Sequence, residues 1–308
     1  MIASETRDVP ARVAIGGASG MIGGAVASAL TSRGTKVERL VRSAKSSAPD
    51  EIWWNPDENQ IDGDRLAGVD AVLHFGGRSI DDRWTEEVKQ EIRQSRIRST
   101  RLLAETIAAL DRRPRTLLVA SGSHYYGDRD AEVLEESSAR GHGFLTDVVV
   151  AWEAAADPAR DAGVRVVNTR FGVVMAAKGG ALDRMLPIFK MGAGGTLGHG
   201  RQWLSWIAID DLVRAVLWLL DHPEIDGGVN VTSPNPVTNA EFTETLGRVL
   251  GRPTLVRVPA LALKVMYGEM GETLLLGSQR MVPRRLLDAG FTFDYPELEA
   301  ALRHVLDA

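Results

Sequence analysis

The chain has 308 residues, of which 44% are hydrophobic and 25% are charged, and its formal net charge is −5. This length suits one large α/β domain with a smaller satellite, and an acidic balance without a basic stripe argues against nucleic-acid or anionic-membrane partners. Because the sequence contains no cysteine, disulfides, thiolate catalysis and zinc–thiolate sites are excluded. No apolar run reaches the roughly 18 residues of a membrane span, and the polar start lacks a signal-peptide core, so we expect a cytoplasmic protein.

Strands and helices alternate along the first half of the chain. Helices are predicted near residues 22–33, at 85–110 and at the start of WEAAADPARDAG (152–163); Thr85 is expected to cap the second, and Pro158 to end or kink the third. The predicted strands are RVAI (12–15), KVERLVR (36–42), AVLHFGG (71–77), RTLLVASGS (115–123) and VRVVNTRFGVV (164–174). This alternation predicts an α/β fold with a Rossmann-type doubly wound parallel sheet.

The alternation of strands and helices stops after residue 175, where a glycine-rich segment begins. A helix at 209–220 and a strand at 229–233 return to the main sheet, and Thr238 with Glu241 forms a predicted capping box. We therefore predict three parts. They are a disordered N-terminal extension (1–11), a dinucleotide-binding domain (12–174 plus 207–233) and a smaller, mostly helical C-terminal lobe (175–206 plus 234–308).

A glycine-rich loop, GASGMIG (17–23), connects the first strand to the first helix. In this context Gly17 permits a tight turn, Gly20 lets the backbone approach a pyrophosphate, and Gly23 lets helix and strand pack closely. The alternative is a merely glycine-rich turn, but strand and helix context favours nucleotide binding. The predicted cofactor-binding residues here and after the third strand are Gly17, Ser19, Gly20, Met21, Ile22, Gly23, Phe75, Gly76 and Gly77.

The end of the second strand distinguishes NADP from NAD. An acidic residue there would bond the ribose 2′-hydroxyl of NAD, whereas an arginine accommodates the 2′-phosphate of NADP. This chain has Arg42 and Ser43 at that place and no acidic residue. The sequence therefore favours NADP over NAD, against the alternative of a solvated arginine at a strand end.

The motifs GGASGMIGG, AVLHFGG, YYGD, GGALDRMLPIFKMGAGGTLGHGRQWLSWIAIDDL and GEMGETLLLGSQRMVPRRLLDAGF together resemble one protein group. It is the atypical extended short-chain dehydrogenase/reductase group whose members are called epimerase family proteins. The resemblance runs from about residue 12 to the end of the chain. It implies a Rossmann domain, a C-terminal lobe over the nicotinamide and NAD(P) as cofactor, but no defined substrate.

Ordinary members of this superfamily use a Tyr-x-x-x-Lys pair to move a proton while a hydride moves to or from nicotinamide. Alignment on Trp152 and Glu153 places Leu145 at the tyrosine position and Val149 at the lysine position. The same absence is typical of the group that this chain resembles. Aliphatic side chains transfer no proton, so conventional dehydrogenase or sugar-epimerase chemistry is in doubt.

The stretch SGSHYYGD (121–128) lies at the carboxyl end of a predicted strand, where doubly wound sheets bind ligands. Strand alternation predicts that Ser121, Ser123 and Tyr125 point to one side, and these are the catalytic candidates. His124 is a predicted substrate contact, with a partly exposed loop histidine as the alternative. For Tyr126 a buried packing residue is favoured over catalysis.

Arg201 and Trp206 complete the predicted substrate contacts, because the corresponding region of extended relatives faces the substrate. A surface arginine and a core tryptophan are the alternatives. Asp210 and Asp211 are interpreted as helix-start caps rather than metal ligands, and no metal site is predicted.

Two functional classes follow from these residues. The first is an NADP-dependent oxidoreductase or epimerase-like enzyme that acts on a small polar substrate with atypical acid–base groups. The second is a non-catalytic, regulatory dinucleotide-binding module; some members of the group, in cyanobacteria and plastids, are linked to division. The hydroxyls of the SGSHYYGD stretch favour the enzyme, and the missing Tyr-x-x-x-Lys pair favours the non-catalytic module. A classical nucleotide-sugar epimerase is the least favoured alternative. A monomer or homodimer is expected.

Overall fold

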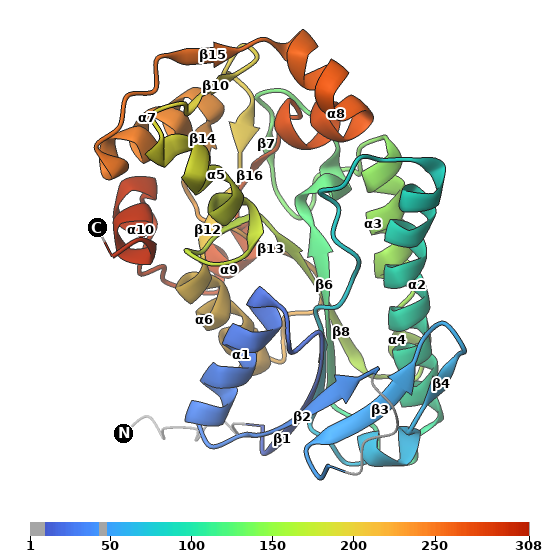
Figure 1. The fold of residues 1–308 in the computed structure, drawn as a ribbon. Helices are drawn as coiled ribbons and strands as arrows, with labels where there is room; N and C mark the ends of the chain where they lie inside the picture. Colours follow the sequence, from blue (N-terminus) through green and yellow to red (C-terminus); the bar gives the residue numbers. More distant parts are fainter. Residues whose placement is uncertain (1–9, 43–47, 308) are drawn as a thin grey trace, which may run out of the picture.

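The computed structural model describes residues 10–42 and 48–307, and it confirms the α/β class. An eight-stranded sheet forms its centre (Figure 1). The spatial strand order is β13 (Gly227–Val231), β8 (Arg165–Phe171), β6 (Thr116–Gly122), β5 (Ala71–His74), β1 (Arg12–Gly16), β2 (Lys36–Val41), β3 (Glu51–Asn55) and β4 (Gln60–Ile61). All neighbouring strands are parallel except β3 and β4, which are antiparallel. The sequence analysis missed β3, a five-residue EIWWN run that pairs with β2 on one side and with β4 on the other.

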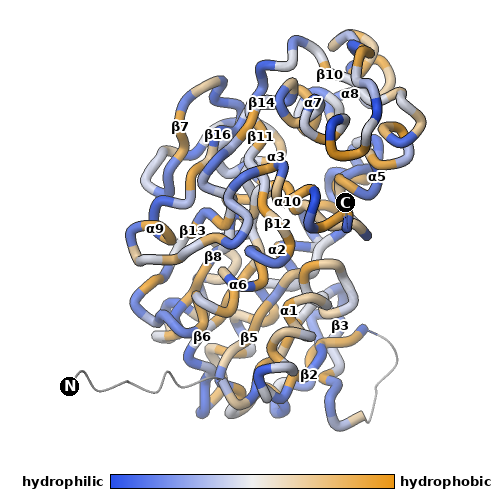
Figure 2. The backbone as a smooth tube through the Cα atoms, turned by 90° about the vertical axis from the view of Figure 1, so that its left-hand side faces the viewer, coloured by the Kyte–Doolittle hydropathy of each residue, from blue (hydrophilic) through white to orange (hydrophobic). Residues whose placement is uncertain are grey.

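Helices cover both faces of this sheet, as the doubly wound pattern requires (Figure 1). One layer contains α1 (Met21–Ser32) and α6 (Ile209–Leu220); the other contains α2 (Glu86–Ala109), α3 (Phe144–Ala154) and α4 (Asp157–Asp161). The Thr85 side chain accepts the Val88 N–H and caps α2. Pro158 lies in the first turn of α4, which confirms the predicted break after α3. Figure 2 shows hydrophobic residues concentrated along the central strands, where the main core lies.

The C-terminal lobe is built from short helices and two-stranded ladders. Its helices are α5 (Gly180–Lys190), α7 (Asn239–Leu250), α8 (Ala260–Leu275), α9 (Arg284–Asp288) and α10 (Leu298–Val305). Two strand pairs lie within it: β10 (Gly195–Leu197) with β15 (Val256–Val258), and β11 (Trp203–Leu204) with β14 (Val237–Thr238). Two further pairs extend beyond the residues assigned to the lobe: β12 (Trp206–Ala208) with β9 (Val173–Met175), and β16 (Arg280–Met281) with β7 (Val133–Leu134). Thr238 and Glu241 form the predicted capping box of α7.

Several contacts attach the lobe to the nucleotide-binding domain. Lys89 of α2 pairs with Glu269 of α8 at 2.5 Å. The buried Asp211 carboxylate at the start of α6 accepts the backbone N–H groups of Asp294 and Tyr295, each at 2.8 Å. Residues 284–291 also pack on the main core through buried apolar side chains, although the boundary drawn from sequence assigned them to the lobe. Sequential position alone did not show this, because the packing depends on where the chain returns in space.

Candidate functional site

The glycine loop after β1 adopts the close-packed geometry that its sequence predicts. Gly17 has φ +80°, and a Cβ atom there would lie 2.7 Å from the Gly76 nitrogen. A Cβ atom on Gly23 would overlap the carbonyl oxygen of Gly17. Any larger residue at either position would therefore displace the loop from the β5 end or from α1.

The N-terminus of α1 follows this loop directly, and no described side chain caps it. Its capping residue, Gly20, offers no side chain, and the first turn contains no acidic residue. The first N–H groups of a helix have no partner within the helix, and the helix dipole is positive there. This end of α1 is consequently suited to a phosphate group.

A cavity of about 890 Å³ opens beside the loop, between the carboxyl ends of β1, β2 and β5 and the helix α2. Five of the predicted cofactor residues line it: Gly17, Ser19, Arg42, Gly76 and Gly77. Gly20, Met21, Ile22, Gly23 and Phe75 shape the loop and its surroundings without lining the cavity. Ser43 lies outside the described residues. The sequence analysis did not predict the contributions of Trp54 on β3, Pro56 and Asp57 after it, or the exposed face of α2.

Four arginines line this cavity, and three of them are already paired. Arg39 bonds Asp50 and Glu51, Arg78 bonds Asp82 and Glu91, and Arg98 lies 3.7 Å from Asp57. Arg42 is exposed and makes no ion pair with any residue that the structure describes. It is therefore the cavity's available guanidinium for an anion.

His74 closes the inner wall of the cavity at the end of β5. Its Nε2 lies 2.8 Å from the Ser99 hydroxyl, and its ring packs edge-on against Trp54 with centroids 5.4 Å apart. Burial, with a smaller contribution from the charge of Arg96, lowers the pKa of His74 to about 4. The imidazole is therefore neutral at pH 7, and it supports Gly16 and Gly76, where an added Cβ would collide with the ring.

The stretch SGSHYYGD lies where predicted, at the carboxyl end of β6, but its side chains do not alternate. The strand ends at Gly122, and Ser123–Tyr126 form a 3₁₀ turn, η2. The Ser121 hydroxyl donates to Glu153 at 2.6 Å, and the Ser123 hydroxyl donates to Gln279 at 3.4 Å. The alternation argument was wrong because a 3₁₀ turn redirects each residue by about 120° rather than 180°.

His124 packs beneath the lobe instead of projecting into the open cavity. Burial lowers its pKa to about 4, opposed by a hydrogen bond to the Thr273 backbone of α8. Its Nε2 is buried and has no partner among the described residues. The proposed substrate contact would require α8 to move away from this ring.

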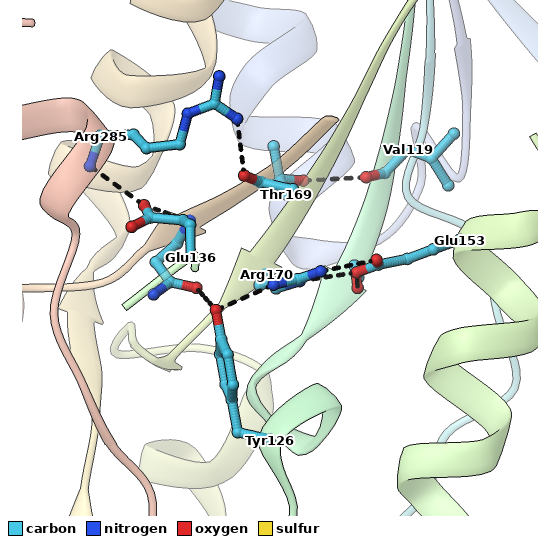
Figure 3. Close-up of polar contacts among 10 residues, drawn as sticks. Val119, Tyr126, Glu136, Glu153, Thr169, Arg170 and Arg285 are labelled. Atoms are coloured by element: carbon cyan, nitrogen blue, oxygen red, sulfur yellow. Dashed lines mark hydrogen bonds and ion pairs between the residues drawn. The ribbon is translucent and has the colours of Figure 1, made fainter. Parts of the chain in front are cut away.

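A polar network that the sequence analysis missed lies at the carboxyl ends of β6, β8 and β13 (Figure 3). Arg170 of β8 is only 5% exposed. Its guanidinium bonds both carboxylate oxygens of Glu153 on α3, each at 2.9 Å, and donates to the Tyr126 hydroxyl at 2.9 Å. Tyr126 in turn donates to Asn230 at 2.8 Å, so it is a buried structural residue as favoured from sequence. The sequence signal for this network was an arginine near the end of a strand, RVVNTRF, whose other residues after Arg165 are apolar or uncharged.

Comparison with known proteins agrees with this geometry. The model of the NAD-dependent epimerase/dehydratase family matches residues 13–231, and a domain of unknown function, DUF1731, matches residues 258–305. This chain belongs to the NAD-dependent epimerase/dehydratase family. Epimerase family protein Mb2239 of Mycobacterium bovis is 42% identical over 291 residues, which are 94% of this chain and 96% of that protein. The human epimerase family protein SDR39U1 is 35% identical, with 96% and 99% covered.

Solved structures extend the likeness to three dimensions. The human SDR39U1 structure, determined with NADPH, superposes with a TM-score of 0.87 at 33% identity and covers 96% of this chain and 99% of that chain. A nucleoside-diphosphate sugar epimerase from Corynebacterium glutamicum has a TM-score of 0.80 at 35% identity, covering 96% of this chain and 58% of that one. The extended short-chain dehydrogenase/reductase fold predicted from the motifs is thereby confirmed.

The sequence alignment predicts Leu145 and Val149 at the positions usual for tyrosine and lysine, and the structure buries both side chains on α3. A Cβ atom on Gly122 would lie 3.9 Å from the Val149 side chain, so this part of α3 does face the end of β6. The contact between helix and strand end is thus apolar at the level of Val149. It becomes polar one helical turn further on, where Glu153 meets Ser121.

The structure places neither of the predicted substrate contacts in the lobe, Trp206 and Arg201, at the cavity. Trp206 is 0% exposed, and its indole N–H donates to the Asn235 carbonyl at 2.9 Å within the lobe core. Its assignment to the substrate is wrong, because β12 pairs with β9 and the Trp206 side chain is buried in the lobe core. Arg201 is exposed in the loop before β11 and does not line the cavity.

Other classes of site find no support in the described part of the chain. Its residues include no group of three or more His, Asp or Glu side chains placed to hold a metal ion. None of its helices is both long and apolar enough to cross a membrane.

Proposed function

We propose that this protein binds NADP(H) and is an oxidoreductase or epimerase-like enzyme that acts on a small polar substrate. The cavity beside the glycine loop is the cofactor site, with the pyrophosphate at the N-terminus of α1. The observation that carries this proposal is Arg42, which has no ion pair with any described residue, in a cavity whose other arginines are paired. A 2′-phosphate supplies the anion that this guanidinium lacks. The NADPH in the structure of the human relative supports the same choice.

The residues present fit the cofactor at three points. Gly17, Arg42 and the Gly76–Gly77 segment all line the cavity. In this proposal the Gly17 loop receives the pyrophosphate and Arg42, just after β2, receives the 2′-phosphate of the ribose. When bound, NADP(H) supplies or accepts the hydride. The protein's own contribution is to bind and orient the dinucleotide and to hold a substrate beyond the ends of β6 and β8.

The second candidate is a non-catalytic dinucleotide-binding module. It is favoured by one observation, the buried aliphatic pair Leu145 and Val149 at the usual proton-transfer positions. Both candidates require the cofactor, and only turnover separates them. A cytoplasmic setting and a monomer or homodimer remain part of this proposal, while one relative from Arabidopsis thaliana is named as chloroplastic.

Fluorescence titration of the purified protein with NADPH and NADH tests cofactor binding. We expect NADPH to bind more tightly. The variant Gly20→Val should remain folded by circular dichroism but fail to bind either dinucleotide, because its branched side chain occupies the place of the pyrophosphate. A folded variant with wild-type affinity for NADPH would refute the assignment of this cavity.

A further inference from the structure

Arg170 provides a fixed positive charge at the end of the sheet. It is the penultimate residue of β8, in register with Ser121 of β6 on one side and Asn230 of β13 on the other. Burial disfavours its charge, but the hydrogen bonds and charge of Glu153 outweigh burial and raise the pKa of Arg170 above its ordinary value. The guanidinium is therefore charged at every working pH and cannot rotate away, because both ends are bonded (Figure 3).

Tyr125 lies directly on this guanidinium. The Arg170 Cζ is 3.3 Å from the centroid of the Tyr125 ring, within the range of a strong cation–π contact. A cation against the ring face stabilises any negative charge that the ring gains when its hydroxyl gives up a proton. In ordinary relatives the lysine of the Tyr-x-x-x-Lys pair supplies the positive charge beside the tyrosine.

The Tyr125 hydroxyl is also the one that the surrounding protein leaves unengaged. Ser121 donates to Glu153, Ser123 donates to Gln279, and Tyr126 donates to Asn230. The hydroxyl of Tyr125 has no hydrogen-bond partner among the residues that the structure describes, and its side chain is partly exposed. Tyr125 lies in the turn directly after β6, at the end of the sheet where doubly wound folds bind ligands.

We propose that Tyr125 is the proton-transfer residue of this protein and that Arg170, held by Glu153, is the positioning residue that replaces the missing lysine. This inference rests on the proposed function. The substrate is a carbonyl compound in one direction and the corresponding secondary or primary alcohol in the other.

In the reducing direction the carbonyl carbon gains a hydride, and the electrons of the C=O π bond move to oxygen. That oxygen takes the proton of the Tyr125 hydroxyl, whose O–H bond breaks and leaves its electron pair on the phenolate. NADPH, oxidised to NADP⁺, supplies both electrons, and water returns a proton to Tyr125. The reverse reaction uses the same groups in the opposite order.

The test compares wild type with Tyr125→Phe on a panel of aldehydes, ketones and α-dicarbonyl compounds, following NADPH absorbance. Wild type should reduce at least one panel member and show a solvent deuterium isotope effect on kcat. Tyr125→Phe should lower kcat by about a hundredfold to ten-thousandfold, leaving KM and the Kd for NADPH within about threefold. The matched control, Tyr295→Phe, lies in the C-terminal lobe, stacked on His304, and should behave as wild type.

Arg170→Lys is the second variant and should lower kcat without changing KM, because an ammonium group cannot hold both Glu153 oxygens and the Tyr125 ring together. If Arg170→Lys fails to fold, Tyr125→Phe still tests the inference, because that variant leaves the Arg170–Glu153 ion pair intact. A Tyr125→Phe variant whose kcat stays within about threefold of wild type overturns the inference. A wild-type protein that binds NADPH but reduces no panel member also overturns it, while cofactor binding stands. Failure to bind NADPH overturns the proposed function itself.

Discussion

Replacing Arg42 with alanine should weaken NADPH binding selectively. Arg42 is exposed at the end of β2 and lines the proposed cofactor cavity without an ion pair to any described residue. Its guanidinium is therefore free to form a bidentate contact with a 2′-phosphate. NADH has no such phosphate, so its affinity should not depend on this side chain.

The magnitude follows from the kind of contact and from its exposure. A hydrogen bond to a charged group contributes about 1.5–3 kcal/mol, and solvent around an exposed side chain keeps this one near the lower end, at about 1.5–2 kcal/mol. Since about 1.4 kcal/mol corresponds to tenfold in affinity, Arg42→Ala should raise the Kd for NADPH roughly ten- to thirtyfold. Raising the salt concentration should reduce the difference between variant and wild type.

The assay is fluorescence titration of both dinucleotides at low and at high salt. The matched control is Arg39→Ala. Arg39 lies on β2, three residues before Arg42, and lines the same cavity, and its replacement removes the same charge; it is already paired with Asp50 and Glu51. We expect the control to change the Kd for NADPH by less than about threefold.

Equal loss of NADPH and NADH affinity in Arg42→Ala would refute the reasoning, because the contact would then not involve the 2′-phosphate. Equal loss of NADPH affinity in the two variants would instead assign the effect to the general positive field of the cavity rather than to Arg42.

Three further changes test the parts that surround the site. Gly23→Ala should abolish cofactor binding because its Cβ overlaps the glycine loop, whereas Gly24→Ala on the same helix meets only ordinary contacts and should bind normally; titration separates them. Glu153→Gln should lower the free energy of unfolding by about 3–5 kcal/mol in urea denaturation, since it leaves the buried Arg170 charge without its counter-ion; an unchanged midpoint would contradict this. His74 has its pKa lowered to about 4 by burial, so its contribution to stability is complete above about pH 6.5 and is lost as the pH falls through 4. In His74→Gln, the free energy of unfolding should lose about 3 kcal/mol of its change between pH 6.5 and 4. The same pH dependence of unfolding in the variant and in wild type would count against this.

Local sequence was sufficient for the turns, caps and breaks of the nucleotide-binding half of this protein. The turn at Gly17, the close approach at Gly23, the cap at Thr85 and the break at Pro158 each depend on the conformational limits of one residue type and its immediate neighbours. Such limits act within a few residues, so they can be inferred without knowing the rest of the fold. The prediction that Leu145 and Val149 replace a tyrosine–lysine pair is also local, because both residues lie on one helix.

Only the tertiary structure decided what surrounds the SGSHYYGD stretch. The sequence placed a tyrosine beyond a strand end but gave no cation beside it, because Arg170 follows Tyr125 by 45 positions and meets it only through the pairing of β6 with β8. Parallel pairing fixes which side chains of distant strands share a face, and no local propensity encodes that register. For the same reason Trp206, which resembles a ligand contact in sequence, is buried in the lobe core, where the pairing of β12 with β9 orients it inward.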